Sequence, residues 1–574
     1  MSSNELPSAA ALVTVFFLLC AGSAHAASDE AAAGDKPPRL ILQITVDQLR
    51  GDLPWRYYER FGKGGFRHLL EKGSVYLDAH HRHANTETIV GHTTLSTGAD
   101  PAAHGMVANV WLDRAQDVLV YNVEDARYPI LTAGAGVDQS TEIDPTQRAA
   151  RSDGRSPAAI QVSTFSDELV LHYGARAKAF GVSVKDRGAI AMAGHGGKAF
   201  WFSKQRGEFI TSRFYYDDYP AWVDEWNARR LPDTYAGKAW DLLNKQATYL
   251  FGDQDDRDYE TALPGFGRVF PHPFGNVDDR YFTTLLTVSP AGDELAVDFA
   301  KTLIEKESLG ADEVPDYLSV SLSSTDYVGH VFGPSSLEAE DNMLRLDRTL
   351  ADLLAYVDKR VGLEQTLVVL SADHGAPEAP GYMRTLGQSA EYIDPETFDA
   401  RAELAPVKAR FGIGEELIVT YYHPYLYLNR ELIRERGLDQ AQVEEAVAEV
   451  LTNFNGVAMA VSSTALAQGR VPNFPLLDSV LRNFSPARSG DIFVVFEPNH
   501  FINDFDGLVV ASTHGSPWRY DTYVPLVFAG PGIPAQRLMR RVETVDVAPS
   551  LAILLGTKPP SGAVGLPLHE LGSP

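Results

Sequence analysis

The chain has 574 residues, which is enough to bury a large core and to form more than one domain. Its formal net charge of −26 at pH 7 argues against a nucleic-acid-binding surface, because phosphate backbones attract patches of Lys and Arg. The acidic residues are spread along the chain and do not form a tail, which indicates a solvated surface.

Residues 1–26 predict a secretory signal peptide. Residues 9–21 are largely apolar but too few to span a bilayer, and Ala24, His25 and Ala26 form a small-x-small cleavage site. Residues 27–38 follow as a flexible leader. Cys20 is the only cysteine, so the mature chain has no thiol and no disulfide, which favours a bacterial periplasmic or secreted protein. No other run is long and apolar enough to predict a membrane span.

Residues 39–574 have the pattern of an α/β fold. A helical pattern, with apolar residues three and four apart, covers 344–357, and a closing helix follows Asp546, a candidate N-cap. Alternation of strands and helices predicts a mostly parallel central sheet with helices on both faces. The apolar runs of strand length are 39–46, 179–184, 317–322, 366–370 and 524–528.

Two regions interrupt this alternation and read as insertions. Residues 201–278 are rich in Tyr, Trp, Asp and Pro. Residues 378–499 contain a helical pattern at 441–453 and a strand-like run at 491–496. We therefore expect a small α+β cap in the second region.

Carboxylates and imidazoles stand where strands are predicted to end. Asp47 follows the first strand, and Asp373 with His374 follows the run 366–370. In open α/β sheets, ligands bind outside the carboxyl ends of the strands, so these side chains predict one shared site. Mixed oxygen and nitrogen ligands suit Zn²⁺. The six candidate metal ligands are Asp47, Asp326, His330, Asp373, His374 and His514.

Several motifs in a fixed order resemble the alkaline phosphatase superfamily. They are Val46-Asp47, the run 85–92 (NTETIVGH) with Ser96-Thr97-Gly98 and His104-Gly105-Met106, the run 326–330 (DYVGH), and 372–375 (ADHG). Within the superfamily, the chain most resembles the bacterial phosphate monoesterases that use a threonine nucleophile. The resemblance covers nearly the whole mature chain and implies an alkaline phosphatase-like catalytic domain.

The resemblance implies two zinc ions per chain and Thr88 as the nucleophile. Thr88 would attack phosphorus and form a phospho-threonine, and it stands four residues before His92, which matches the family position. Thr86 is the competing nucleophile in the same motif. The ligands would be Asp326, His330 and His514 for one ion, and Asp47, Asp373, His374 and the Thr88 hydroxyl for the other.

Three further residues are expected to recognise the phosphate. In the monoesterase branch, residues that match Asn109, Lys185 and Arg187 contact the non-bridging phosphate oxygens. Two cations favour a monoester dianion over a diester, although Lys185 and Arg187 could also be surface charges after a strand. The expected substrates are therefore small-molecule phosphate monoesters.

Other functions remain as alternatives. A nucleotide pyrophosphatase/phosphodiesterase would share the nucleophile and all metal ligands. A sulfatase would need a cysteine or serine at the nucleophile position, which Thr88 occupies. A phosphoglycerate mutase would usually be cytoplasmic with a serine nucleophile, and an inactive binding protein would be expected to have lost ligands. The oligomeric state is left open.

Weaker signals point to minor roles. The tract His80-His81-Arg82-His83 reads as a strand approaching the nucleophile loop more readily than as a metal site. His92 and His104 are expected to support that loop by hydrogen bonding. The acidic loops at 253–258 and 503–507 could bind Ca²⁺, but neither has a full calcium-loop spacing, so solvated loops are favoured.

Overall fold

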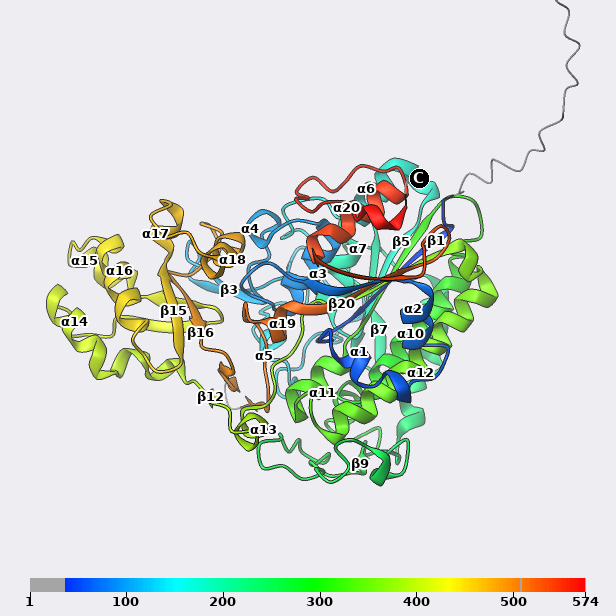
Figure 1. Ribbon diagram of the computed structural model, residues 1–574, viewed down its shortest axis with the longest axis horizontal. Helices are drawn as coiled ribbons and strands as arrows, with labels where there is room; N and C mark the ends of the chain where they lie inside the picture. Colours follow the sequence, from blue (N-terminus) through cyan, green and yellow to red (C-terminus); the bar gives the residue numbers. More distant parts are fainter. Residues whose placement is uncertain (1–36, 506–507, 573–574) are drawn as a thin grey trace, which may run out of the picture. The chain divides into compact units, whose positions relative to one another are not determined.

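The computed structural model describes residues 37–505 and 508–572. The expected signal peptide, Cys20 and residues 27–36 of the leader lie outside the described residues. Within them, a nine-stranded sheet forms the centre of the α/β fold (Figure 1). Its strands, in spatial order, are β21 (Gln536–Glu543), β2 (Ser74–His80), β20 (Tyr523–Ala529), β11 (Thr366–Ser371), β1 (Leu40–Val46), β10 (Asp316–Leu322), β5 (Ala179–Ser183), β6 (Lys198–Ser203) and β7 (Glu208–Ile210).

Most of the sheet is parallel, as the sequence predicts. Strands β11, β1, β10, β5 and β6 are parallel to one another. The run 524–528 is confirmed as a strand, but β20 is antiparallel to both β11 and β2. All seven residues of β1 are buried, which explains why the central strands are continuous apolar runs.

Alternate residues of β1 face two different cores. Leu42 and Ile44 pack in a core with α10 (Pro290–Lys306) and α12 (Leu337–Arg360), whereas Ile41 packs in a core with α6 (Phe165–Tyr173) and α20 (Val547–Leu554). The sheet therefore has helices on both faces (Figure 1).

Helix α12 contains the predicted helix 344–357 but begins earlier, where the Ser336 hydroxyl accepts a hydrogen bond from the Ala339 N–H. Asp546 is the N-cap residue of α20, as predicted, but its side chain makes no capping hydrogen bond. Its carboxylate accepts hydrogen bonds from the N–H groups of Glu543 and Leu566 instead.

The two interrupting regions differ in how they pack. In 201–278, helix α8 (Ala221–Ala228) and the short strands β8 (Ala239–Trp240) and β9 (His272–Pro273) surround aromatic side chains that share the core of β1, among them Trp222, Trp226 and Trp240. This region therefore extends the main core.

Residues 378–499 instead contain a separate antiparallel sheet. Its four strands, in spatial order, are β13 (Ile418–Tyr422), β14 (Tyr425–Leu428), β16 (Ile492–Phe496) and β15 (Val457–Ser462). With α14 (Ala405–Phe411) and α16 (Gln440–Leu451) it encloses its own core, in which Leu426 packs with Val447. Strand β16 and helix α16 coincide with the strand and the helix expected at 491–496 and 441–453.

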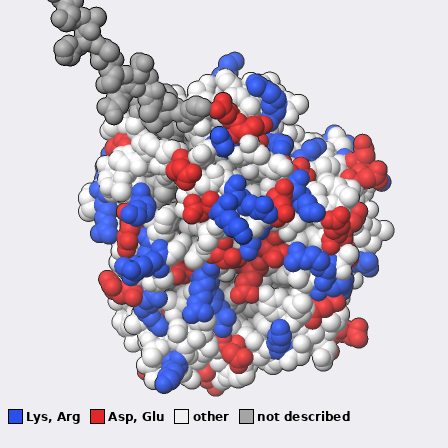
Figure 2. All heavy atoms as spheres, turned by 90° about the vertical axis from the view of Figure 1, so that its right-hand side faces the viewer, with Lys and Arg blue, Asp and Glu red and all other residues white. Residues whose placement is uncertain are grey.

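The charged residues on the face in Figure 2 are mixed in sign, with Lys and Arg beside Asp and Glu. None of the helices in the described part of the chain combines the length and the hydrophobicity needed to cross a bilayer.

The acidic loop 253–258 uses two carboxylates in protein contacts. Asp255 accepts a hydrogen bond from the Phe270 N–H at 3.1 Å, and Asp256 pairs with Arg268 at 3.0 Å. The loop 503–507 includes residues 506–507, which lie outside the described residues. Calcium binding at either loop stays a prediction.

Glu260 gives the first testable prediction. Its side chain is 4% exposed, and burial together with repulsion from Glu338 raises its pKa to about 9. The folded state therefore keeps a proton that the unfolded state loses above the ordinary pKa of 4.5, so stability falls as pH rises from there to about 9. Gln has no proton to lose in this range. Glu260→Gln is therefore expected to avoid a fall in the free energy of unfolding of up to about 1.4 kcal/mol per pH unit.

Urea unfolding of both proteins between pH 5 and pH 9 would measure this difference, with the exposed Glu59→Gln as the matched control. The free energy of unfolding of Glu260→Gln should rise relative to that of the wild-type protein as pH increases. If this difference does not grow with pH, Glu260 is ionised in the folded protein.

Candidate active site

The site lies where four adjacent parallel strands end. Asp47 follows β1, and its N–H donates to the carbonyl oxygen of Leu322, the last residue of β10. Asp373 follows β11 and accepts a hydrogen bond from the Gln48 N–H at 3.1 Å. Residues far apart in the sequence therefore converge, as predicted from the strand ends. The remaining site residues come from α11 (Ser324–Phe332) after β10, from α7 (Asp186–Ala193) with Lys185 after β5, from α3 (Thr88–Thr97), and from the loop around His514.

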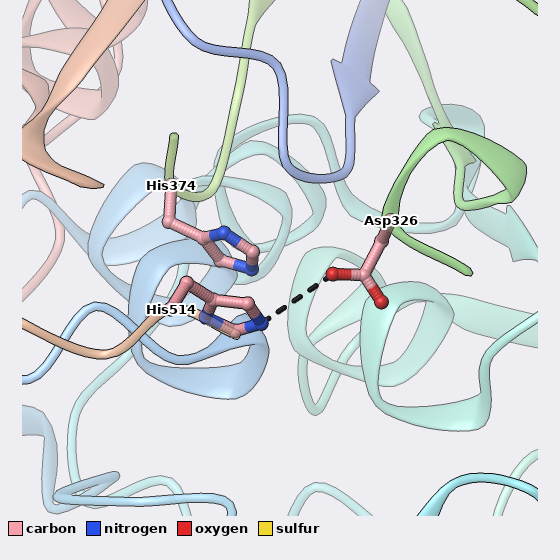
Figure 3. Close-up of side chains that lie close together, drawn as sticks. All are labelled: Asp326, His374 and His514. Carbon is pink, nitrogen blue, oxygen red and sulfur yellow. Dashed lines mark ion pairs between the residues drawn. The ribbon is translucent and has the colours of Figure 1, made fainter. Parts of the chain in front are cut away.

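The first predicted ligand set meets at the Asp326 carboxylate. Asp326 and His330 lie one turn apart on α11, and Asp326 Oδ1 is 3.2 Å from His330 Nε2. The same oxygen is 3.4 Å from His514 Nε2 (Figure 3). The structure therefore brings the three residues of this set together.

The second set meets around His374. His374 Nε2 lies 3.4 Å from Asp47 Oδ1 and 3.4 Å from Asp373 Oδ2. The ring of His374 also stacks on His514, with centroids 3.5 Å apart, so its ligand atom lies within 4.8 Å of those of Asp326 and His514 (Figure 3). His374 thus stands at the border of the two sets, which the sequence did not predict.

Each histidine presents Nε2 to the centre of the site. His330 Nδ1 lies 2.8 Å from the Ser512 carbonyl oxygen, and His514 Nδ1 lies 2.9 Å from that of Thr86. His374 Nδ1 likewise lies 2.9 Å from the carbonyl oxygen of Gly375. Because a carbonyl only accepts, each Nδ1 carries the proton, which leaves the Nε2 lone pair for a metal ion.

The carboxylates also fit a cation. Asp47, Asp326 and Asp373 are buried carboxylates, and the one Lys or Arg paired with them among the described residues is Lys185, which contacts Asp47 Oδ2 and Asp326. Buried carboxylates require a compensating charge, which a metal ion supplies. Burial opposes protonation of His374, but Asp373 and Asp47 outweigh it and raise its pKa to about 9. A metal ion held by the same carboxylates would compete with that proton.

Thr88 is the first residue of α3 and is 1% exposed. Arg187 Nη2 donates to its hydroxyl oxygen at 3.4 Å. Gly91 lets the helix lie directly against the end of β11, because a Cβ at that position would be only 1.8 Å from the Asp373 carbonyl oxygen. By contrast, the Thr86 hydroxyl donates to the Ser516 carbonyl at 2.9 Å, as a structural residue would.

The sequence profile of the type I phosphodiesterase / nucleotide pyrophosphatase family matches residues 41–517. Alkaline phosphatase PafA of Elizabethkingia meningoseptica is 33% identical over 93% of this chain and 94% of that protein. Its fold agrees too: the crystal structure of wild type alkaline phosphatase PafA has a TM-score of 0.85 and 31% identity, over 93% of this chain and 99% of that chain. The chain belongs to the alkaline phosphatase superfamily.

Two further relatives are similar. A Myroides odoratus protein named calcium-transporting ATPase is 33% identical over 93% of this chain and 94% of that protein. A solved PafA variant with one threonine, one asparagine, one lysine and one arginine replaced has a TM-score of 0.84 and 30% identity, and it covers 93% of this chain and 99% of that chain.

Arg187 is held firmly in this alkaline phosphatase superfamily site. Its Nη1 pairs with Asp144 Oδ2 at 2.6 Å, while Nη2 points to Thr88. Burial disfavours the ionised form of Asp144, but Arg187 outweighs this and holds the pKa of Asp144 below its usual value. Sequence reasoning missed Asp144, whose only local signal is a helix cap, since it accepts hydrogen bonds from the N–H groups of Thr146 and Gln147.

Lys185 and Asn109 are the other two residues that are expected to contact the phosphate. The fully buried Lys185 ammonium lies 2.8 Å from Asp47 Oδ2 and also contacts the Asp326 carboxylate, so it bridges the two ligand sets. Asn109 Oδ1 accepts a hydrogen bond from the Ile89 N–H at 3.2 Å, which leaves the Asn109 NH₂ group as its donor toward other partners.

The other histidines support the site, as expected. His92 Nε2 lies 2.9 Å from the Ser321 hydroxyl, and His104 Nε2 lies 3.2 Å from that of Thr94. In the tract at 80–83, His81 lies 3.0 Å from the Ala372 carbonyl oxygen, just before Asp373. None of the described histidines in this tract belongs to a metal-ligand cluster.

Proposed function

We propose that this protein is a secreted, zinc-dependent phosphate monoesterase that acts through a phospho-threonine on Thr88. The enzyme class, phosphomonoesterase, rests on the similarity to proteins named alkaline phosphatase. The main structural support for the reaction is that several groups meet at the carboxyl ends of β1, β10 and β11. They are Thr88, the guanidinium of Arg187 and two sets of metal-ligand candidates. Export would proceed through the signal peptide expected at residues 1–26.

Six residues would hold two Zn²⁺ ions, together with the hydroxyl of Thr88. Bound zinc would supply Lewis acidity, which lowers the pKa of the threonine hydroxyl and stabilises the leaving oxygen. The residues are Asp326, His330 and His514 for one ion, and Asp47, Asp373 and His374 for the other. The Nδ1 contacts with backbone carbonyls, which direct each Nε2 to the centre of the site, and the three buried carboxylates that share one lysine support this assignment.

The chain's own residues carry the two displacements. The Thr88 hydroxyl gives its proton to solvent, and Oγ forms a bond to phosphorus as the bond to the leaving oxygen breaks; the departing alkoxide takes a proton from water. A second water then attacks the phosphorus and gives up a proton as the bond to Oγ breaks, so that Oγ regains a proton from solvent and inorganic phosphate is released. Arg187 neutralises a non-bridging oxygen in both steps, and the position of Thr88 at the N-terminus of α3 favours an anion there.

Recognition of a dianion separates this function from the runner-up. A nucleotide pyrophosphatase/phosphodiesterase would use the same metal ligands and the same threonine. We assign Arg187, Lys185 and Asn109 to the non-bridging oxygens of a monoester. The PafA variant with a threonine, an asparagine, a lysine and an arginine replaced supports treating these four residue types as one functional group.

Metal removal tests this proposal. Dialysis against a chelator is expected to lower kcat for an aryl phosphate by at least about 10³-fold, because threonine is a weak nucleophile at its ordinary pKa. Added Zn²⁺ should restore activity at about two ions per chain. Full activity in metal-free protein would contradict the proposal.

A further inference from the structure

The cleft beside Thr88 has walls of two kinds. Its empty volume, counted out to the open solvent, is about 850 Å³. Its lining includes Asn109, Arg187, Asp326, His330 and His514, which the proposed reaction uses. The rest of the wall is largely apolar and has no role in that reaction. We call this apolar wall the leaving-group wall; it consists of Ile143, Leu263, Val331, Phe501, Ile502 and Val510.

The leaving-group wall is fixed relative to the metal ligands. Val331 follows His330 on α11, and its carbonyl oxygen accepts a hydrogen bond from the Thr261 N–H at 2.8 Å. The Thr261 hydroxyl donates to the Val509 carbonyl at 2.9 Å, and the Ala511 N–H donates to the His330 carbonyl at 2.8 Å. The segments that carry Leu263 and Val510 are thus hydrogen-bonded to each other and to the helix that carries Asp326 and His330.

Beyond the phosphoryl-binding residues, the described lining of the cleft offers a second anionic group no Lys or Arg. Arg187 is the only Lys or Arg among the described residues that line it, and one of its nitrogens is already paired with Asp144. Glu87 also lines the cleft and is held by hydrogen bonds from Asn85 and Asn109. A second anion on the leaving group would lose its water against the wall without meeting a cation, which is unfavourable.

We infer that the cleft selects phosphate monoesters whose leaving group is uncharged and largely apolar, such as aryl phosphates, and discriminates against leaving groups that carry a second anion, such as diphosphates. This inference rests on the proposed phosphatase function and adds the substrate class. An aryl ring buries apolar surface against Leu263, Val331 and Phe501 while the phosphoryl group lies at Arg187.

Two aryl phosphates matched in phenol pKa test the inference, one with a neutral carboxamide and one with a carboxylate on the ring. Matching the pKa removes the difference in chemical reactivity. We expect kcat/KM to favour the neutral ester by at least about 10-fold. Equal values in the wild-type protein would overturn the inference.

Leu263→Lys places a cation in the leaving-group wall. It is expected to reduce or reverse the preference for the neutral ester, while Leu171→Lys, the same change at an exposed helical position, leaves it unchanged. Inhibition by phenylphosphonate and by methylphosphonate gives a readout without a leaving group, and the wild-type protein should bind phenylphosphonate at least about 10-fold more tightly. Equal inhibition by the two phosphonates, or an unchanged ester preference in folded Leu263→Lys, would contradict the inference.

Different outcomes would contradict the phosphatase function and the selectivity of the leaving-group wall. If the zinc-loaded protein hydrolyses neither aryl ester, the proposed function is wrong. If it hydrolyses both at the same kcat/KM, the phosphatase function stands and the leaving-group wall has no selective role.

Discussion

Thr88→Ala is expected to lower kcat for an aryl phosphate monoester by at least about 10⁴-fold, because removal of a nucleophile eliminates the covalent route. The Thr88 hydroxyl is the one that Arg187 reaches, at the start of α3 beside Asp373. Single-turnover kinetics and the zinc content of the purified variant would measure both consequences. Zinc should remain bound, since six side chains other than Thr88 are assigned to hold it.

Two matched variants control this experiment. Thr86→Ala removes a neighbouring hydroxyl that donates to the Ser516 carbonyl, so it should cost far less than Thr88→Ala. Thr88→Ser keeps a hydroxyl and should retain much of the activity. An active Thr88→Ala protein together with an inactive Thr86→Ala protein would move the nucleophile to Thr86.

Arg187→Ala should lower kcat/KM for a monoester by about 10²- to 10³-fold, the usual effect of losing one donor to a developing charge, and for the matching diester by less than about 10-fold. The guanidinium is oriented by Asp144 toward Thr88, where the dianionic phosphoryl group would bind. A diester has one negative charge fewer for it to neutralise. Equal losses on both substrates would contradict a role in dianion recognition.

Stability must be separated from recognition in this variant. Arg187→Ala leaves the buried Asp144 carboxylate without its guanidinium, which is destabilising. The double variant Arg187→Ala/Asp144→Asn removes that uncompensated charge. We expect it to regain stability in urea unfolding and to keep the low monoester activity. Recovery of monoester activity in the double variant would show that Arg187 acts only through folding.

The central strands could be predicted because they are buried on both faces and are therefore continuous apolar runs. The edge strand β21 was not predicted, because its sequence QRLMRRVE is largely exposed and carries three arginines. The direction of β20 was not predicted either, since an apolar run has the same pattern in a parallel and an antiparallel pairing.

The candidate site was predictable where side chains directly follow strands or share one helical turn, as Asp47 and the pair Asp326 and His330 do. Spacing does not determine rotamers, so the place of His374 against His514 could not be foreseen. The pairing of Asp144 with Arg187 and the leaving-group wall both bring together segments that are far apart in the sequence, and no sequence motif predicts these contacts. Only the folded chain brings them together.

The ratio of kcat/KM for an aryl phosphate monoester to kcat/KM for the matching diester, measured on the zinc-loaded protein, decides between the two functions that share this site. We expect a preference for the monoester of at least about 100-fold, because Arg187, beside Thr88, is assigned together with Lys185 to the non-bridging oxygens of a dianion. A preference for the diester would keep Thr88 and the metal ligands, but it would make the protein a phosphodiesterase and contradict the assigned role of both cations.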